Sequence, residues 1–108
     1  MPYYLVQSSD SREGWTGLMK DDLEKRIQYI AGIVEKMGGK LEGCWASFGE
    51  YDWVFLFQMP DNETAASLAI TVIAGGAVKA CKTTPLLTVK EAAAALKKAA
   101  ASGYQPPK

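Results

Sequence analysis

Apolar residues along this chain gather into short runs that favour strands and into spaced stripes that favour helices. The runs lie at residues 1–7, 40–48, 53–59 and 77–87, and the third is the richest in aromatic and β-branched residues. Between the first two runs, apolar side chains recur every three or four positions, at Leu23, Ile27, Ile30, Val34 and Met37. This spacing predicts an amphipathic helix.

Start and stop signals delimit that helix and two others. Aspartates at 21–22 and at 61, and the capping-box pattern that begins at Thr88, stand where helix N-termini are expected. Double glycines at 38–39 and 75–76 stand where left-handed C-terminal caps are expected. The second helix should therefore follow Asp61, and the third, alanine-rich helix should run from Thr88 to about Ala101.

The segment Ser8–Lys20 is polar, contains two glycines and shows no clean period. It is long for a connection in so small a domain, and long connections often serve as lids or binding loops. Trp15 stands inside it, either filling a gap over the core or contacting a ligand. The pattern predicts a loop that borders a pocket on the sheet.

A tight turn at Phe48–Trp53 is predicted to join the second and third strands into the central hairpin of a sheet. Strand alternation then separates two faces, one with Leu41, Gly43, Trp45, Val54 and Leu56, the other with Cys44, Ala46, Phe48, Trp53, Phe55 and Phe57. Both faces are apolar. Because a sheet with one wet side alternates between apolar and polar residues, this sheet needs covering on both sides.

The order strand, helix, strand, strand, helix, strand predicts an α+β fold of the ferredoxin-like βαββαβ kind, with a four-stranded antiparallel sheet and an additional C-terminal helix. Pro85 places the fourth strand at an edge. Right-handed crossovers put both main helices on one face, and the apolar residues of the other face favour a face-to-face homodimer. The domain is expected to span residues 1–103, followed by a flexible tail at 104–108.

Composition narrows the class of protein. Acidic and basic residues balance at 12 each, which argues against nucleic-acid and membrane-surface partners, and no apolar run is long enough to span a bilayer. The chain has no histidine, and Cys44 and Cys81 lie far apart, so neither a metal site nor a histidine-activated nucleophile is expected. Two isolated cysteines are typical of a cytoplasmic protein. No cofactor is expected.

The chain resembles the GYD domain family over residues 2 to about 97. The matching stretches are Pro2-Tyr3-Tyr4, Glu13-Gly14, Gly38-Gly39-Lys40-Leu41, Phe48-Gly49-Glu50-Tyr51-Asp52, Gly75-Gly76-Ala77-Val78-Lys79 and Lys82-Thr83-Thr84-Pro85. Each stretch is short, and their combination is specific. The resemblance implies a ferredoxin-like, dimeric α/β-barrel protein and carries no established activity.

The hairpin holds the candidate catalytic residues Glu50, Tyr51 and Asp52. Carboxylates and a phenol at the rim of a cleft suit proton transfer or the orientation of a substrate. The competing interpretation is structural, because Gly49 and Asp52 also suit a tight turn.

The candidate ligand-binding residues are Trp15, Trp45, Tyr51, Lys82 and Thr84. A lysine beside a threonine hydroxyl suits a carboxylate or phosphate. The competing interpretation is that lysines on an edge strand prevent aggregation. Alternation places Lys82 and Thr84 on one face of their strand, so both can serve the same pocket.

The leading hypothesis is a homodimer, or higher homo-oligomer, that acts as a binding or accessory module for a small apolar or carboxylate ligand. The alternative is a cofactor-independent enzyme, such as a monooxygenase or isomerase, that uses Tyr51 with Asp52 or Glu50. A third hypothesis is a structural assembly subunit, because open edges of such sheets can pair into rings.

Overall fold

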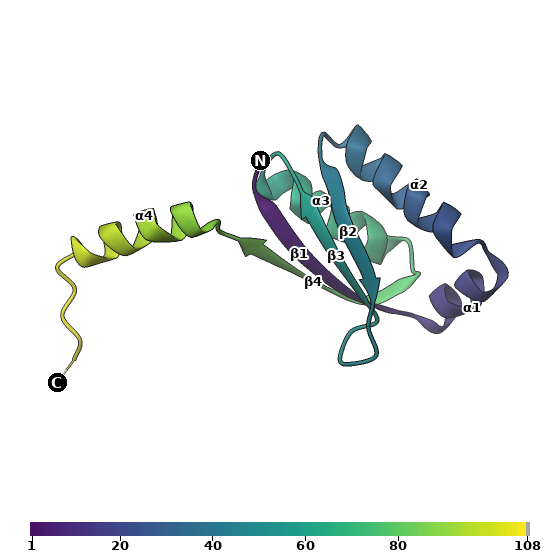
Figure 1. The fold of residues 1–108 in the computed structure, drawn as a ribbon. Coiled ribbons are helices and arrows are strands. Elements are labelled where there is room, and N and C mark those ends of the chain that lie inside the picture. Colours follow the sequence, from purple (N-terminus) through teal and green to yellow (C-terminus); the bar gives the residue numbers. More distant parts are fainter. Residues whose placement is uncertain (108) are drawn as a thin grey trace.

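A computed structural model describes residues 1–107, and within them it contains four helices and one four-stranded antiparallel sheet (Figure 1). The elements follow in the order β1 (Tyr3–Asp10), α1 (Arg12–Lys20), α2 (Leu23–Lys36), β2 (Lys40–Ala46), β3 (Trp53–Gln58), α3 (Asn62–Ala74), β4 (Val78–Leu86) and α4 (Val89–Ala100). The strand order is β2-β3-β1-β4. The fold is α+β, and the Pro85-bearing strand lies at an edge, as expected.

The helix boundaries that the cap signals predict are confirmed. Asp22 and Asp61 each accept a backbone N–H from the first turn of the helix that follows, and Thr88 opens α4 with a reciprocal capping box. Gly38 and Gly76 have φ angles of +86° and +82°. These left-handed angles favour glycine because it has no Cβ.

The core lies between the sheet and the two helices α2 and α3, which share one face. Its buried apolar residues are Tyr4, Val34, Phe55, Phe57, Met59, Ala65 and Leu68. The Tyr4 hydroxyl donates a hydrogen bond to Oδ1 of Asn62 (2.6 Å), which ties β1 to the start of α3. Phe55 and Phe57 stack with their ring centroids 5.4 Å apart. The central strands β1 and β3 therefore lie directly under the helices.

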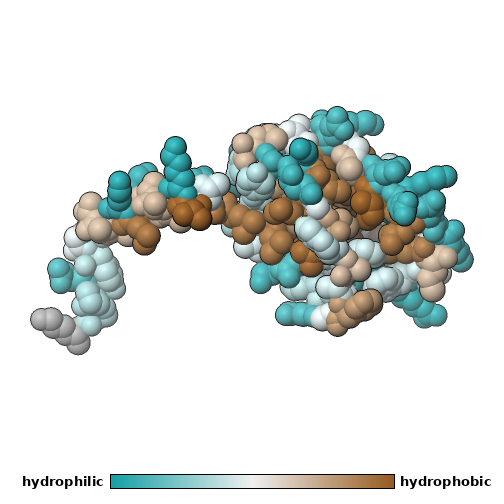
Figure 2. Space-filling model, viewed as in Figure 1, coloured by the Kyte–Doolittle hydropathy of each residue, from teal (hydrophilic) through white to brown (hydrophobic). Residues whose placement is uncertain are grey.

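This chain leaves the other sheet face open. Strand pairing places on it the apolar residues Tyr3, Leu5, Trp45, Val54, Leu56 and Leu86. Trp45 is 57% exposed, and its ring lies so close over Gly43 that a Cβ there would overlap it. Apolar residues gather over the strands in Figure 2. The expectation of a sheet with two apolar faces is confirmed.

Two expectations about β2 are wrong. A bulge between Leu41 and Gly43 shifts the register against β3, so Leu41 packs against the core instead of facing away with Trp45. β2 ends at Ala46, and Phe48 is fully exposed in the loop that follows, instead of facing the core from the strand. Simple alternation fails here because a bulge adds one residue to the strand. On one side of that extra residue, the side chains point to the sheet face opposite to the one that alternation predicts.

The segment Ser8–Lys20, expected as a loop, is instead the end of β1 followed by α1. The Oγ of Ser11 accepts the N–H of Gly14 (3.1 Å) and donates to the carbonyl of Gly76 (2.8 Å). Gly14 approaches Ala77 so closely that a Cβ would overlap the Ala77 carbonyl oxygen. This glycine therefore allows α1 to approach the residue that precedes β4, and reading it as a loop signal was misleading.

α4 projects away from the sheet beyond the end of β4, and none of its residues is buried (Figure 1). The radius of gyration is 17.1 Å, compared with about 13 Å for a compact domain of 100 residues.

The expected tail has no helix or strand as far as residue 107, and its last residue, Lys108, lies outside the described residues. None of the helices within residues 1–107 combines the length and apolarity needed to cross a bilayer.

Replacing Gly14 by alanine should destabilise the protein, because the new methyl group would overlap the Ala77 carbonyl oxygen and push α1 away from β4. We expect the free energy of unfolding, measured by urea denaturation, to fall by about 2 kcal/mol. Gly17→Ala is the matched control in the same helix: its Cβ meets open space, and alanine should stabilise the helix by about 0.5–1 kcal/mol. Equal stability of the two variants would contradict the contact.

Candidate functional site

A cleft of about 470 Å³ lies between α2, α3 and the sheet. Its floor is formed by Val6, Phe55 and Phe57, and its walls are apolar side chains of the two helices, Ile27, Ile30, Ile33, Ala65, Leu68 and Val72. Residues of α1, including Gly14 and Leu18, border it as well. The two helices thus leave a partly open apolar space above the aromatic floor.

A buried carboxylate stands at the α1 end of this cleft. Asp10, the last residue of β1, is only 7% exposed. Its Oδ2 accepts a hydrogen bond from the indole N–H of Trp53 (2.8 Å), and its backbone N–H donates to Oδ2 of Asp52 (2.9 Å). Burial raises the pKa of Asp10, the Trp53 hydrogen bond partly offsets this, and the charge of Asp52 raises the pKa further.

Three smaller polar side chains line the same sheet surface. Ser8 pairs with Cys81 across β1 and β4, and Thr83 lies two residues further along β4. Burial raises the pKa of the Cys81 thiol, and its hydrogen bond with Thr83 lowers the pKa only in part. A thiol with a raised pKa is a poor nucleophile. This end of the cleft therefore offers hydroxyl and thiol groups for hydrogen bonding.

Charged residues of both signs line the cleft, and acids predominate. Glu13, Asp21 and the buried Asp10 line it together with one guanidinium, that of Arg26, which lies over the Tyr29 ring at 5.0 Å. Because like charges repel in a partly desolvated site, this arrangement favours a neutral or cationic ligand over an anion.

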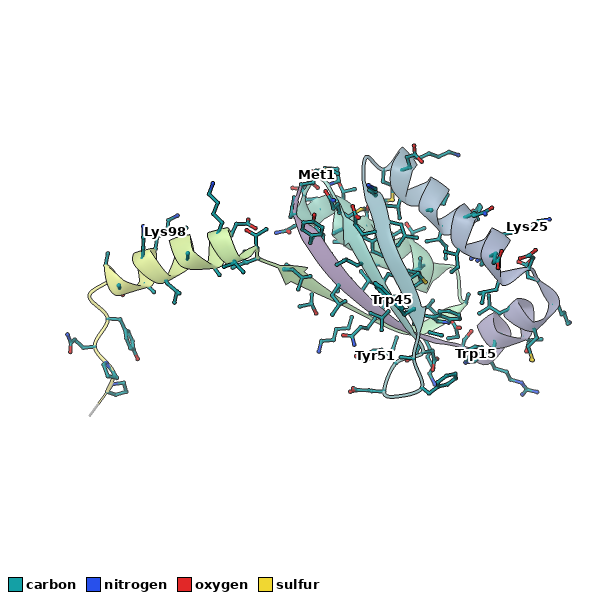
Figure 3. All side chains as sticks on the ribbon, in the orientation of Figure 1. Met1, Trp15, Lys25, Trp45, Tyr51 and Lys98 are labelled. Atoms are coloured by element: carbon teal, nitrogen blue, oxygen red, sulfur yellow. The ribbon has the colours of Figure 1, made fainter. Side chains whose placement is uncertain are left out.

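The candidate catalytic residues share the loop between β2 and β3. Glu50 is exposed, and its carbonyl accepts a hydrogen bond from Oγ of Ser9 (3.4 Å). The backbone N–H of Asp52 donates to the carbonyl of Ser8 (2.8 Å). Tyr51 lies beside Asp52 in this loop and is half-buried (Figure 3). The loop is thus anchored to the end of β1, next to Asp10.

The candidate ligand-binding residues are divided between the two sides of the sheet. Trp15 lies on α1, and its ring centroid is 6.3 Å from that of Trp53, on the helix side. Trp45 lies on the open face (Figure 3). The strand register places Lys82 and Thr84 on the same face. None of these four residues lines the cleft, nor does Tyr51, the fifth candidate. The candidate catalytic residues Glu50 and Asp52 do not line it either.

Sequence reasoning missed Asp10, because the polar residues around it suggested a loop. The available signal was the position of Asp10 directly after the apolar run of the first strand. The end of a strand can place a side chain beneath a helix that packs on the sheet.

Within residues 1–107 no three His, Cys, Asp or Glu side chains come close enough together to hold a metal ion. The burial and raised pKa of Asp10 make it a candidate for hydrogen bonding or proton transfer.

Comparison with known proteins bears on the fold and the family. The family model of the GYD domain matches residues 4–96. The crystal structure of TTHA0845 from Thermus thermophilus superposes with a TM-score of 0.52 at 16% sequence identity, over 82% of this chain and 96% of that chain. At this identity the likeness concerns the fold alone. The curated proteins offer no match to the chain.

Replacing Asp10 by asparagine should change the pH dependence of stability. A folded-state pKa above the unfolded value means that the wild-type protein loses stability as pH rises through that window. Relative to wild type, Asp10→Asn should therefore gain stability as pH rises above 3.8, the ordinary aspartate pKa, measured as the difference in free energy of unfolding.

The control for this experiment is an aspartate whose pKa is shifted the other way. Hydrogen bonds from Thr64 lower the pKa of Asp61, so Asp61→Asn should lose stability relative to wild type as pH rises toward 3.8, the ordinary aspartate pKa, and the difference should stay constant above it. Parallel curves for the two variants would show that the burial of Asp10 has no effect on its titration.

Proposed function

The chain belongs to the GYD domain family, and we propose that it is a homodimeric small-molecule-binding module whose ligand occupies the cleft between α2 and α3. The observation that supports this most is the cleft itself, with apolar walls and one buried carboxylate at its end. Its volume of about 470 Å³ lies within the range of roughly 300–1,000 Å³ that ligand pockets occupy.

The lining sets the chemistry of the ligand. Filling the space above Phe55 and Phe57 removes apolar surface from water, at about 2.5 kcal/mol for each 100 Å² covered. Asp10 and Ser8 at one end call for a group that donates hydrogen bonds. The ligand is therefore a compact, mostly apolar molecule with a donor group, and a free carboxylate is a poor fit beside Asp10.

The homodimer in this proposal is a ferredoxin-like, dimeric α/β barrel in which two sheets pack with their open faces together. Exposed Trp45 and half-buried Leu56 on that face support it, because monomers rarely leave such an apolar patch in water. Lys82 and Thr84 belong to the same face and are assigned to this interface instead of to the cleft. Free Cys44 and Cys81 suit a reducing cytoplasm.

A second candidate function is cofactor-independent catalysis in the same cleft. It is favoured by the pairing of Asp10 with Asp52, because burial and a neighbouring negative charge shift the pKa of an acid toward the range useful for proton transfer. Tyr51 and Glu50 belong to the loop that carries Asp52 and are the other proton-transfer groups of this alternative, although none of the three lines the cleft.

Filling the cleft tests the binding function. Ala69 lines it from α3, whereas Ala66 lies on the exposed side of the same helix. Native mass spectrometry of the protein purified gently from cells should show a bound small molecule on wild type and on Ala66→Leu, and at least tenfold less on Ala69→Leu, because the larger side chain occupies the ligand's space. Equal occupancy of the two variants would place the ligand elsewhere, and a ligand-free wild type would contradict the function.

Asp10→Asn separates binding from catalysis. Asparagine keeps an acceptor for the Trp53 indole but cannot exchange a proton. If the module only binds, the molecule identified by mass spectrometry should bind the variant with an affinity within about tenfold of wild type, and neither protein should convert it. Conversion by wild type and its loss in Asp10→Asn would establish the enzyme instead.

A further inference from the structure

The C-terminal arm, residues 87–104, carries large apolar side chains that the described chain leaves uncovered. Val89 is 88% and Leu96 72% exposed, and Leu87 and Tyr104 are also exposed. Along α4 the apolar residues recur at a helical interval and form one stripe, with Val89, Ala93, Leu96 and Ala100. Figure 2 shows apolar residues at the root of the arm and along it.

α4 needs a surface to pack against. It has 12 residues, and isolated helices shorter than about 12–15 residues are marginal in water even when they are rich in alanine. Its capping box satisfies the first-turn N–H groups but buries no apolar area. In most proteins the stability of such a helix comes from covering its apolar face.

The cleft is too small to be that surface. A helix of this length is roughly 18 Å long and 10 Å wide, which corresponds to a volume of roughly 1,400 Å³. The cleft holds about 470 Å³. The arm therefore packs outside the cleft, and the cleft remains available to a small molecule.

The size of the open sheet face indicates that a second copy receives the arm. Four strands about 4.8 Å apart, paired over about six residues, present a flat area of roughly 400 Å², half of the ~800 Å² per partner that stable interfaces bury. If the arms are exchanged, each copy both gives and receives a helix footprint of roughly 180 Å². The area of the sheet face and the helix footprints together then approach the area that a stable interface buries. Leu86 and Leu87 join the sheet face to the arm, so the two contact areas are continuous.

Symmetry indicates where the arm lands. The arm leaves the sheet where Leu86 pairs with Tyr3, whereas the β2–β3 loop lies at the opposite end of the strands (Figure 1). When two sheets stack with the two-fold axis across the strands, the arm end of one copy lies over the loop end of the other. That loop presents Phe48, which is fully exposed and has no packing role in its own chain as described.

Charge also favours association of the arm with the rest of a chain. α4 carries Lys90, Lys97 and Lys98 against the single acid Glu91, and the whole chain has a formal net charge of 0. Everything outside α4 is therefore net acidic. Opposite net charges on the arm and on the body attract each other.

We propose that α4 is exchanged between two copies of the chain and docks its apolar stripe against Phe48 of the partner subunit. This inference rests on the homodimer of the proposed function and adds the segment that holds it together. Each copy contributes its arm to the other, so the contact occurs twice in the dimer.

Sedimentation equilibrium of the full chain tests the exchange. Leu96→Glu puts a charge into the stripe, and Phe48→Glu puts one into the receiving loop; each should raise the dimer dissociation constant by about a hundredfold or more, because two symmetric apolar contacts are lost. The double variant should be little weaker than either single one, since both break the same contact. Ala94→Glu, on the opposite side of α4, is the matched control and should stay within about threefold of wild type.

The outcomes separate this inference from the proposed function. A wild-type chain of monomer mass overturns the homodimer and the exchange together. A wild-type dimer whose dissociation constant is the same for Leu96→Glu and Ala94→Glu overturns the exchange alone, and an unchanged constant for Phe48→Glu overturns docking on the loop. Docking of the arm on its own subunit is tested in monomers made by Leu56→Lys: adding Leu96→Glu should leave their melting temperature unchanged, and a fall would contradict exchange.

Discussion

One sheet with two apolar faces, in a chain whose main helices cover only one of them, is the constraint on which this structure depends. The crossovers place α2 and α3 on the same side because each connection is right-handed. Phe55 and Phe57 are buried there, whereas Trp45 and Leu56 on the other side remain in contact with solvent. Apolar area left in water reduces stability in proportion to its size. The open sheet face and the C-terminal arm are therefore the two parts of this chain that would gain stability from being covered.

The helix side is itself filled only in part. α2 and α3 do not close over the aromatic floor, and the space between them ends at Asp10. A carboxylate held in such a place lowers stability unless something compensates, and the indole of Trp53 is the compensation that the protein provides. Buried acids that reduce stability are typical of functional sites. A core built for stability alone would place an apolar residue at this position.

The sequence predicts the large elements well, because caps, double glycines and helical spacing are local signals. The three predicted helices and four strands appear in the structure, with ends that agree within a few residues. Local signals failed where distant contacts decide. Gly14 suggested a loop, whereas this glycine allows the close approach to Ala77, the residue before β4 and more than sixty positions away. The bulge at Leu41 depends on the pairing of β2 with β3. The candidate site was harder to predict from the sequence than the helices and strands. Asp10 is recognisable as a candidate only by its hydrogen bonds with Trp53 and Asp52, and these residues come close to it only in the folded sheet.

If the cleft binds the proposed ligand, the anchoring of α1 affects how quickly that ligand leaves. Ser11 bonds to Gly76 and to the carbonyl of Ala77, so α1, the end of α3 and the start of β4 are fixed to one another. Within residues 1–107 no hydrogen bond of this kind ties α2 to α1, α3 or the sheet, and Gly38, which follows α2, has a φ of +86°. A ligand of the proposed kind would then leave the cleft by outward displacement of α2, while the opposite wall acts as a stationary support.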